Sequence, residues 1–296
     1  MTAGVARSKA ERRVRDRRVA AARKQIEMML DRVFRPASWA AALSYRVGLQ
    51  GRVRVSEMVL HTSPPQQREA PLRIGFASDF HAGPTTDRRT LAAACRALAA
   101  LEPDVVLLGG DFVSVRGEDI GQLEPYLAEL EAPLGKFAVL GNHDLRANTS
   151  VIVDALARAG VRLIVNERVI LEPPFDDISV CGIDDPTYGD PRPELALDGA
   201  TGIRIVLMHS PETLPAIGNR AFDLALCGHT HGGQVATPWG APILLPGGPL
   251  NRRYCRGQFE VGGETARTLL VSRGVGCSGL PARVFAAPEV HVCLIT

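Results

Sequence analysis

Five short apolar runs in this chain each end in aspartate, asparagine or histidine, and this repeated junction constrains the fold more than any other feature. The runs are LRIGFAS (72–78), DVVLLGG (104–110), KFAVLG (136–141), IRIVLM (203–208) and FDLALCG (222–228). Apolar runs of this length, with little polar alternation, are typical of strands that are covered on both faces. Because helical stretches separate several of them, the pattern predicts an α/β fold.

Further segments complete the predicted secondary structure. Additional strands are expected at 52–61, 161–166 and 178–183, and helices at 87–101, 120–132 and 149–159. Residues 63–71 are proline-rich and polar, which indicates a loop. From about residue 232, glycine and proline cluster and long helical stretches cease, so we expect a more antiparallel region there.

Charge is distributed unevenly along the chain. Residues 1–24 hold nine basic and two acidic side chains, a net charge of +7, whereas the other 272 residues sum to −5. The sequence from about residue 8 to 33 favours helix. Within it, Ile26, Met29, Leu30 and Val33 are spaced to share one face.

We therefore predict a basic N-terminal helical extension over residues 1–51 and one large domain over residues 52–296. A basic helix can lie on an anionic membrane surface, contact nucleic acid, or simply pack weakly on the body of the chain. The acidic body disfavours nucleic acid as a partner. No apolar stretch reaches the roughly 18 residues of a spanning helix. We expect a cytoplasmic protein, with peripheral attachment to the inner face of the membrane through residues 1–33 as an alternative.

The six cysteines predict a reducing environment. They are spread along the chain without a CxxC pair, and several lie inside apolar runs. Cysteines of this kind usually behave as small buried apolar residues rather than as disulfide partners. Cys227, two residues before a histidine, is expected to be a core thiol.

The polar residues that follow the five runs share one chemical character. They are Asp79, His81, Asp111, Asn142, His143, Asp144, His209, His229 and His231. Ligands bind at the carboxyl ends of strands in α/β sheets, so we expect these side chains to meet at one edge. A single histidine at a strand end is usually structural, but five of the seven histidines of the chain lie here. The pattern therefore indicates a functional site.

These side chains are suited to binding metal ions. Mixed oxygen and nitrogen ligands suit manganese, iron, zinc, cobalt or nickel, and they argue against calcium. The set is too large for one ion, and it could hold two divalent ions if one carboxylate bridges them. Two neighbouring ions can clamp the attacking and leaving oxygens of a phosphoryl transfer and lower the pKa of a bound water.

Five sequence blocks resemble the signature of the calcineurin-like metallophosphoesterases. The blocks are DFH (79–81), GGD (109–111), GNHD (141–144), MHS (208–210) and GHTH (228–231). Further segments are similar to one bacterial branch that is often membrane-tethered and includes hydrolases like the UDP-diacylglucosamine pyrophosphatases. They are GHTHGGQ (228–234), SRGVG (272–276) and the final residues 281–296. The resemblance covers roughly residues 52–296 and implies a four-layer α/β/β/α sandwich.

The resemblance also implies a role for each site residue. The implied ligands are Asp79, His81 and His231 for one ion, Asn142, His209 and His229 for the other, and Asp111 as the bridge between them. His143 is implied as a non-ligand histidine that contacts the phosphate and protonates the leaving oxygen, with Asp144 as its orienting partner. A histidine suits general acid work near neutral pH, and a neighbouring carboxylate can fix its tautomer.

The expected function follows from this resemblance. It is hydrolysis of phosphodiester or pyrophosphate bonds, with nucleotide-linked lipids among the candidate substrates, by attack of a metal-bridging hydroxide with His143 assisting the leaving group. A nuclease of the same superfamily and a non-catalytic metal-binding module are the alternatives. Arg273 and Arg283 could bind a substrate phosphate, but loop arginines are more often solvated or paired within the protein.

Overall fold

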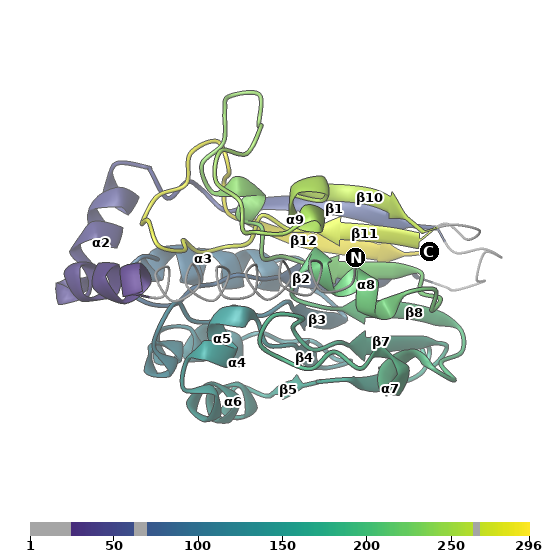
Figure 1. Ribbon diagram of the computed structural model, residues 1–296. Coiled ribbons are helices and arrows are strands. Elements are labelled where there is room, and N and C mark those ends of the chain that lie inside the picture. Colours follow the sequence, from purple (N-terminus) through teal and green to yellow (C-terminus); the bar gives the residue numbers. More distant parts are fainter. Residues whose placement is uncertain (1–24, 62–69, 263–266) are drawn as a thin grey trace, which may run out of the picture.

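Two stacked β-sheets form the centre of the molecule (Figure 1). The computed structural model describes residues 25–61, 70–262 and 267–296. The first sheet has the strand order β1-β12-β2-β3-β4-β5, with β1 (Arg54–Leu60), β12 (Glu289–Ile295), β2 (Leu72–Ala77), β3 (Val105–Leu108), β4 (Lys136–Ala138) and β5 (Val161–Leu163). The second has the order β10-β11-β9-β8-β7-β6, with β10 (Gly257–Val261), β11 (Arg267–Val271), β9 (Leu224–Cys227), β8 (Ile203–Leu207), β7 (Ile178–Gly182) and β6 (Glu167–Ile170).

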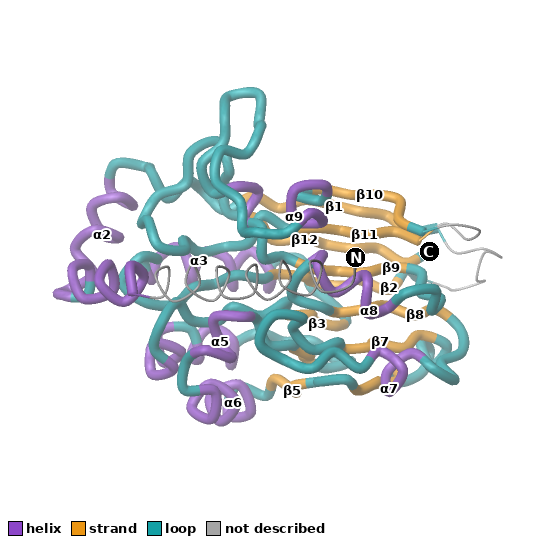
Figure 2. Tube along the Cα trace, viewed as in Figure 1, coloured by secondary structure: helices purple, strands orange, loops and turns teal. Residues whose placement is uncertain are grey.

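Both sheets are mostly parallel at their centres. Strands β2 to β5 run parallel in the first sheet, as do β7, β8, β9 and β11 in the second. Strands β6 and β10 are antiparallel edge strands, and β12 runs antiparallel to β2. Parallel strands deliver their carboxyl ends to the same edge of a sheet, and long loops project beyond one end of the strands in Figure 2.

Helices complete a four-layer α/β/β/α sandwich. The α-helices with defined bounds are α2 (Trp39–Arg46), α3 (Arg88–Ala99), α4 (Glu124–Ala128), α5 (Asn142–Arg146), α6 (Thr149–Arg158), α7 (Pro193–Leu197), α8 (Leu214–Ile217) and α9 (Pro249–Arg253). Short 3-10 turns are η1 (Pro36–Ser38), η2 (Gly117–Gln122), η3 (Pro211–Thr213) and η4 (His231–Gly233). Helices α3, α4 and α6 pack on the outer face of the first sheet, and α7 and α8 on that of the second.

Alternating side chains of each strand fill different cores, and this explains why the strands are apolar throughout. In β3, Val105 and Leu107 point into the core between the sheets, while Val106 and Leu108 pack under the helices. All four side chains are fully buried. Burial of an aliphatic side chain stabilises the fold by about 1.5–3 kcal/mol, so a polar residue on either face would be strongly destabilising.

The structure confirms every predicted strand and corrects some boundaries and contacts. The predicted helix 120–132 is two short pieces, η2 and α4, because Pro125 lacks an N–H and takes an N-terminal position of a new helix. The pattern did not reveal β6, a partly exposed edge strand. Beyond residue 232, β10 and β11 are antiparallel as expected, but β12 joins the first sheet.

The N-terminal part of the described chain lies at one end of the molecule, at the left in Figure 1. Residues 25–34, hereafter helix 25–34, are helical and are followed by α2. Three of the four residues predicted to share a face, Ile26, Met29 and Val33, are each more than half exposed, whereas Leu30 is only partly exposed. Residues 1–24, which carry the predicted basic charge, lie outside the described residues.

All six cysteines are free thiols, and only Cys255 is not fully buried. Cys227 packs in the core on the outer face of the second sheet, as expected, and burial raises the pKa of its thiol well above the usual value. Among the described residues, no helix has both the length and the apolar character needed to cross a membrane.

Candidate metal centre

The nine predicted site residues lie at the carboxyl ends of five parallel strands. Asp79 and His81 follow β2, Asp111 follows β3, and the segment that begins at Asn142 follows β4. In the second sheet His209 follows β8, and His229 and His231 follow β9. All of these side chains except that of His229 are buried. The strand ends of both sheets therefore meet in one cluster, as the sequence predicted.

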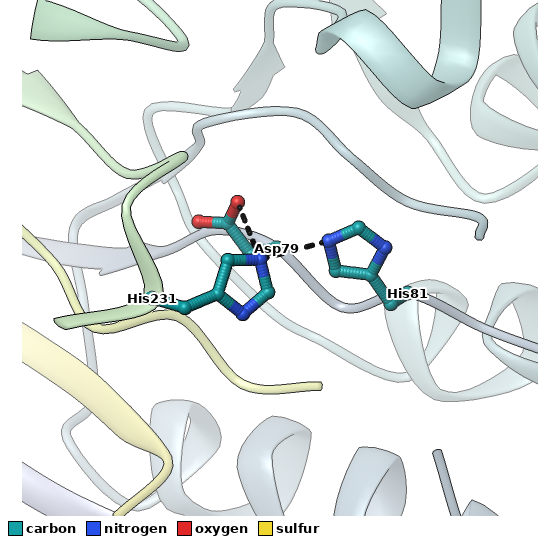
Figure 3. Close-up of side chains that lie close together, drawn as sticks. All are labelled: Asp79, His81 and His231. Carbon is teal, nitrogen blue, oxygen red and sulfur yellow. Dashed lines mark hydrogen bonds and ion pairs between the residues drawn. The ribbon is translucent and has the colours of Figure 1, made fainter. Parts of the chain in front are cut away.

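Asp79, His81 and His231 form the first group (Figure 3). The Nε2 atoms of His81 and His231 lie 3.0 Å apart, and Nε2 of His231 lies 3.5 Å from Oδ1 of Asp79. Figure 3 shows the two rings and the carboxylate turned toward a common point. Three ligand atoms thus converge from β2 and from the loop after β9.

Asp111, His209 and His229 form the second group. Nε2 of His209 lies 3.1 Å from Nδ1 of His229 and 3.1 Å from Oδ1 of Asn142. The same nitrogen lies 3.3 Å from Oδ2 of Asp111. Nδ1 of His209 faces the carbonyl of Gly109 at 2.8 Å, so the proton of the neutral ring sits on Nδ1 and leaves a lone pair on Nε2.

One oxygen of Asp111 faces both groups. Its Oδ2 lies 3.5 Å from Nε2 of His81 and 3.3 Å from Nε2 of His209. Its other oxygen, Oδ1, accepts a hydrogen bond from the backbone N–H of His143 at 2.7 Å. This backbone contact fixes the carboxylate in the position that joins the two groups.

The donor set fits divalent metal ions. Ligand atoms about 2.0–2.2 Å from one ion lie roughly 3–3.5 Å from each other, which matches the separations within both groups. Two neutral imidazole nitrogens that face each other can share at most one proton, so a cation satisfies such a pair better than a hydrogen bond does. Exposed acidic clusters are common without metal, but these groups are buried.

The backbone around the site is held in an unusual conformation. Five residues of the cluster have positive φ angles, between 46° and 71°: Asp79, His81, Asp111, His229 and His231. Residues other than glycine rarely adopt this region, and each such position costs on the order of 1 kcal/mol or more. Five such positions at one cluster indicate that the fold sacrifices stability to aim these side chains.

A glycine directly before His229 lets two ligand-bearing loops pack closely. A Cβ atom on Gly228, directly before His229, would overlap Oδ2 of Asp79 and the hydroxyl of Ser78. The N–H of His229 donates to both oxygens of Asp79 at 3.0 Å. The two loops that carry these ligands are thus in direct contact.

Burial and mutual contact set the charges of the cluster. Burial lowers the pKa of His81 and of His231 well below the usual histidine value, so both rings are neutral at pH 7. Burial alone would raise the pKa of Asp111, but the surrounding histidines, His209 foremost, lower it well below its usual value. Burial raises the pKa of Asp79 to about 6, against the opposing effect of His209. Burial lowers the pKa of His209, but Asp111 and the other nearby carboxylates outweigh it and raise this pKa well above the usual value. Neutral imidazoles and a charged Asp111 are the forms that bind metal, so a bound cation would replace the proton of His209.

His143 faces the site as the resemblance implied, but Asp144 does not contact the His143 ring. The ring of His143 faces the site, but its Nδ1 donates to the carbonyl of Ser114 at 2.6 Å. The carboxylate of Asp144 instead accepts from the backbone N–H groups of Gly141, Phe112 and Val113 at 2.8–3.2 Å. Asp144 therefore holds the backbone next to Ser114, and the Ser114 carbonyl orients the His143 ring.

The structure shows the partners of Arg273 and Arg283, the two arginines near the site. Arg283 is buried and donates to three backbone carbonyls, and its Nη2 lies 3.1 Å from Nδ1 of His231. Arg273 pairs with Glu289 at 3.4 Å. Both arginines thus pair within the protein. Sequence analysis missed Arg146, although its place four residues after Asn142 puts it on the same side of a helix.

A cavity of about 550 Å³ lies over the cluster. Its polar floor includes Asp111, Asn142 and His143, and its wall includes apolar side chains from Leu30, Leu244, Leu245, Pro246 and Leu280. A cavity of this size is typical of a small-molecule site. A mainly apolar wall above a polar floor suits a substrate with a charged group and an apolar part.

Comparison with known proteins gives a consistent result. The family model described as calcineurin-like phosphoesterase matches residues 72–233, which contain all nine site residues. An uncharacterized metallophosphoesterase of Aquifex aeolicus is 31% identical over 252 residues, covering 82% of this chain and 92% of that protein.

Two relatives carry names that state an activity. The phosphodiesterase YaeI of Escherichia coli is 31% identical over 229 residues, covering 75% of this chain and 81% of its own length. The UDP-2,3-diacylglucosamine pyrophosphatase LpxG of Chlamydia trachomatis is 28% identical over 279 residues, covering 76% and 83% respectively. These matches extend well beyond the five motifs.

Proposed function

The chain belongs to the calcineurin-like phosphoesterase family, a family of metal-dependent phosphoric ester hydrolases, and we propose that it cleaves phosphodiester or pyrophosphate bonds with two divalent ions. The observation that carries this proposal is the position of Asp111. One carboxylate oxygen within 3.5 Å of a histidine nitrogen in each group is the arrangement expected of a bridging ligand.

The proposed ligands divide between the two groups. Asp79, His81 and His231 would hold one ion, Asn142, His209 and His229 the other, and Asp111 would bridge. Two divalent ions held by these residues would supply Lewis-acid stabilisation of the phosphate oxygens and would lower the pKa of a bound water. Manganese, iron, zinc, cobalt and nickel all suit this mixed set of ligands.

We propose that His143 gives a proton to the leaving oxygen. The Ser114 carbonyl accepts from Nδ1 of His143 at 2.6 Å and leaves Nε2 for the substrate. The neutral ring has no proton on Nε2 in this arrangement, so the imidazolium is the form that donates. Burial lowers the pKa of His143, which makes this form a stronger acid. Asp144 acts as a positioning residue, because its bonds to the N–H groups of Phe112 and Val113 hold the segment that carries Ser114.

For the substrate we propose a phosphodiester or pyrophosphate with an apolar part, such as a nucleotide-linked lipid. Support comes from the apolar wall of the cavity, including Leu30, Leu244 and Leu280, and from the name of the LpxG relative. The cytoplasmic location predicted from the sequence stays a prediction.

We also propose peripheral contact with an anionic membrane through residues 1–33. The exposed apolar face of Ile26, Met29 and Val33, which follows the basic residues 1–24 directly, supports this contact. Co-sedimentation with phosphatidylglycerol vesicles should fall when Ile26 and Met29 are both changed to serine. Equal sedimentation of the variant and the wild type would refute it.

The function is tested by hydrolysis of bis-p-nitrophenyl phosphate. Metal-stripped protein should be inactive, reconstitution with manganese should restore turnover, and His143→Ala should lower kcat by about 10²–10⁴-fold while both ions stay bound. Glu124→Gln, which breaks a surface ion pair with Arg158, is the matched control and should keep full activity. Turnover that is independent of metal, or unchanged in His143→Ala, would contradict the proposal.

A further inference from the structure

Helix 25–34 contacts the site through a charged pair that the reaction outlined above does not use. We propose that Arg146 binds a phosphate group of the substrate, and that Glu27 on helix 25–34 pairs with Arg146 until the substrate displaces it. This inference rests on the proposed phosphoesterase function. It adds a substrate-binding residue and an internal competitor to that site.

Arg146 is placed to reach the substrate. It is the last residue of α5, whose first residues are Asn142 and His143, and its Nε donates to the carbonyl of Asn142 at 3.1 Å. Its guanidinium lies 5.4 Å from the centre of the Tyr188 ring. These contacts hold the side chain beside the candidate metal ligands. Arg146 and His143 line both the main cavity and an adjoining one of about 360 Å³.

The chemistry of Arg146 suits a phosphate. A guanidinium carries several N–H donors in a planar fork, which matches two oxygens of a phosphate or a carboxylate. In the structure, Nη1 of Arg146 donates to Oε2 of Glu27 at 3.0 Å, and both side chains are only 14% exposed. A carboxylate from a distant part of the chain thus sits on a cation at the site. An anionic substrate group would compete for the same donor.

Helix 25–34 is anchored beside the site largely by ion pairs. Asp31 is buried between Arg35 and Arg116, and Arg35 also pairs with Asp119 at 2.8 Å. These contacts fasten the helix to the segment that follows Ser114. The two carboxylates are buried and the two arginines are partly exposed, so these pairs hold the helix in place without a hydrophobic core.

The outer face of the same helix leaves room for movement. Its apolar residues Ile26, Met29 and Val33 are exposed, so the burial that fixes most helices in place is small here. Leu30 on the inner side lines the main cavity. A substrate that enters the cavity would therefore displace Glu27 by breaking its charged contact with Arg146 rather than by opening a core.

A carboxylate on the same chain competes at a high effective concentration, in the millimolar range for tethered groups. Removing its charge should therefore strengthen phosphate binding by about three- to tenfold. Removing the guanidinium should weaken phosphate binding by about tenfold or more, since a charge-assisted hydrogen bond is lost. If Glu27 acts only through Arg146, its removal has no effect once Arg146 is absent.

The experiment is a double-mutant cycle on the manganese-loaded protein. The affinity for inorganic phosphate is measured by calorimetry, and KM and kcat with bis-p-nitrophenyl phosphate, for the wild type, Glu27→Gln, Arg146→Ala and the double variant. Glu27→Gln should lower the phosphate Kd and KM with kcat within about twofold, and Arg146→Ala should raise both. The double variant should match Arg146→Ala. Glu124→Gln serves as the control for loss of an ion pair elsewhere.

Unchanged phosphate affinity in Glu27→Gln, or an equal gain in the Arg146→Ala background, would overturn the proposal. Arg146→Lys keeps the charge without the fork and provides a second test if Arg146→Ala does not fold, since it should weaken phosphate binding to an intermediate degree. Lack of turnover in the wild type would count against the proposed function alone, because the calorimetric cycle still decides whether Glu27 and Arg146 compete with phosphate.

Discussion

Two buried clusters of acid and histidine lie in the part of the chain that the structure describes, and they differ in the partners of their carboxylates. In the first, at the strand ends, Asp111 lies among His81, His209 and the backbone of His143. In the second, on β12, Glu289 lies 3.3 Å from His291. Both carboxylates are at most 5% exposed, so burial alone does not distinguish a functional site.

The partners of the two carboxylates make the distinction. The oxygens of Glu289 accept from the hydroxyl of Ser56 at 2.6 Å and from the backbone N–H of Arg273 at 3.2 Å. The cluster at the strand ends instead turns histidine nitrogens toward each other at 3.0 and 3.1 Å, and two facing imidazole nitrogens can share only one proton.

The backbone conformation also differs between the two clusters. Glu289 and His291 belong to a regular strand paired on both sides, with Glu289 opposite Arg54 and His291 opposite Phe76. Five residues of the other cluster have left-handed backbone conformations. The comparison teaches that backbone strain and the convergence of several ligand atoms, more than residue type, identify the site built to hold something else.

Asp111→Asn should produce the largest difference between the clusters. Loss of the charge on the shared ligand should lower kcat/KM by at least about 10³-fold, in line with removal of a central electrostatic group. It should also lower the metal content measured by atomic emission. Glu289→Gln is the matched control, and it should keep both its metal and its activity. Full metal content in the Asp111→Asn protein would contradict the proposed bridging role of Asp111.

Metal addition should separate the clusters next. Ions that bind only the folded state stabilise it by about 3–4 kcal/mol at 100 to 1,000 times Kd. Thermal unfolding should therefore shift upward with manganese in the wild type and in Glu289→Gln. Asp111→Asn should show little shift. An equal shift in all three proteins would place the binding of the ion elsewhere.

The smallest expected effect is the loss in acid of the stability that the Glu289 cluster contributes. Burial opposes the charge, but His291, Ser56 and Arg273 lower the pKa of Glu289 to about 2. A depressed folded pKa means that the stabilisation is present above about pH 4.5 and is lost as the pH falls toward 2. Glu289→Gln should cost on the order of 2 kcal/mol of unfolding free energy at pH 6 and progressively less below pH 4. Urea unfolding at several pH values measures this, and a pH-independent difference would contradict the assigned cause.

Much of the fold could be predicted because its signals are local. Apolar runs such as 104–110 and 203–208 form buried parallel strands, and the helix at 87–101 begins at Asp87, whose side chain caps the N–H of Arg89. The edge strand β6 could not be predicted, because its partly exposed residues lack a clear period. The break at Pro125 shows that one residue can divide a helix that composition favours.

The candidate site could be predicted as a set of residues but not as a set of contacts. Strand ends and residue types predicted that Asp79 and His231 belong to one site, although 152 positions separate them in the sequence. The actual partner of His143 is the carbonyl of Ser114, and every residue has a carbonyl, so no sequence pattern distinguishes it. For the same reason the partners of Asp144 could not be predicted. Its carboxylate was expected to contact His143, and it accepts from backbone N–H groups instead.

By itself the sequence determined the strands, the edge where they end, and the ligand chemistry that meets there, because periodicity and residue type are properties of short segments. Tertiary structure alone decided which oxygen of Asp111 faces both groups, which backbone positions are strained, and that Glu27 reaches Arg146 across 119 positions. Such contacts depend on how loops from two sheets and a terminal helix pack in space. Their energies are a few kcal/mol each, and they leave no periodic trace along the chain.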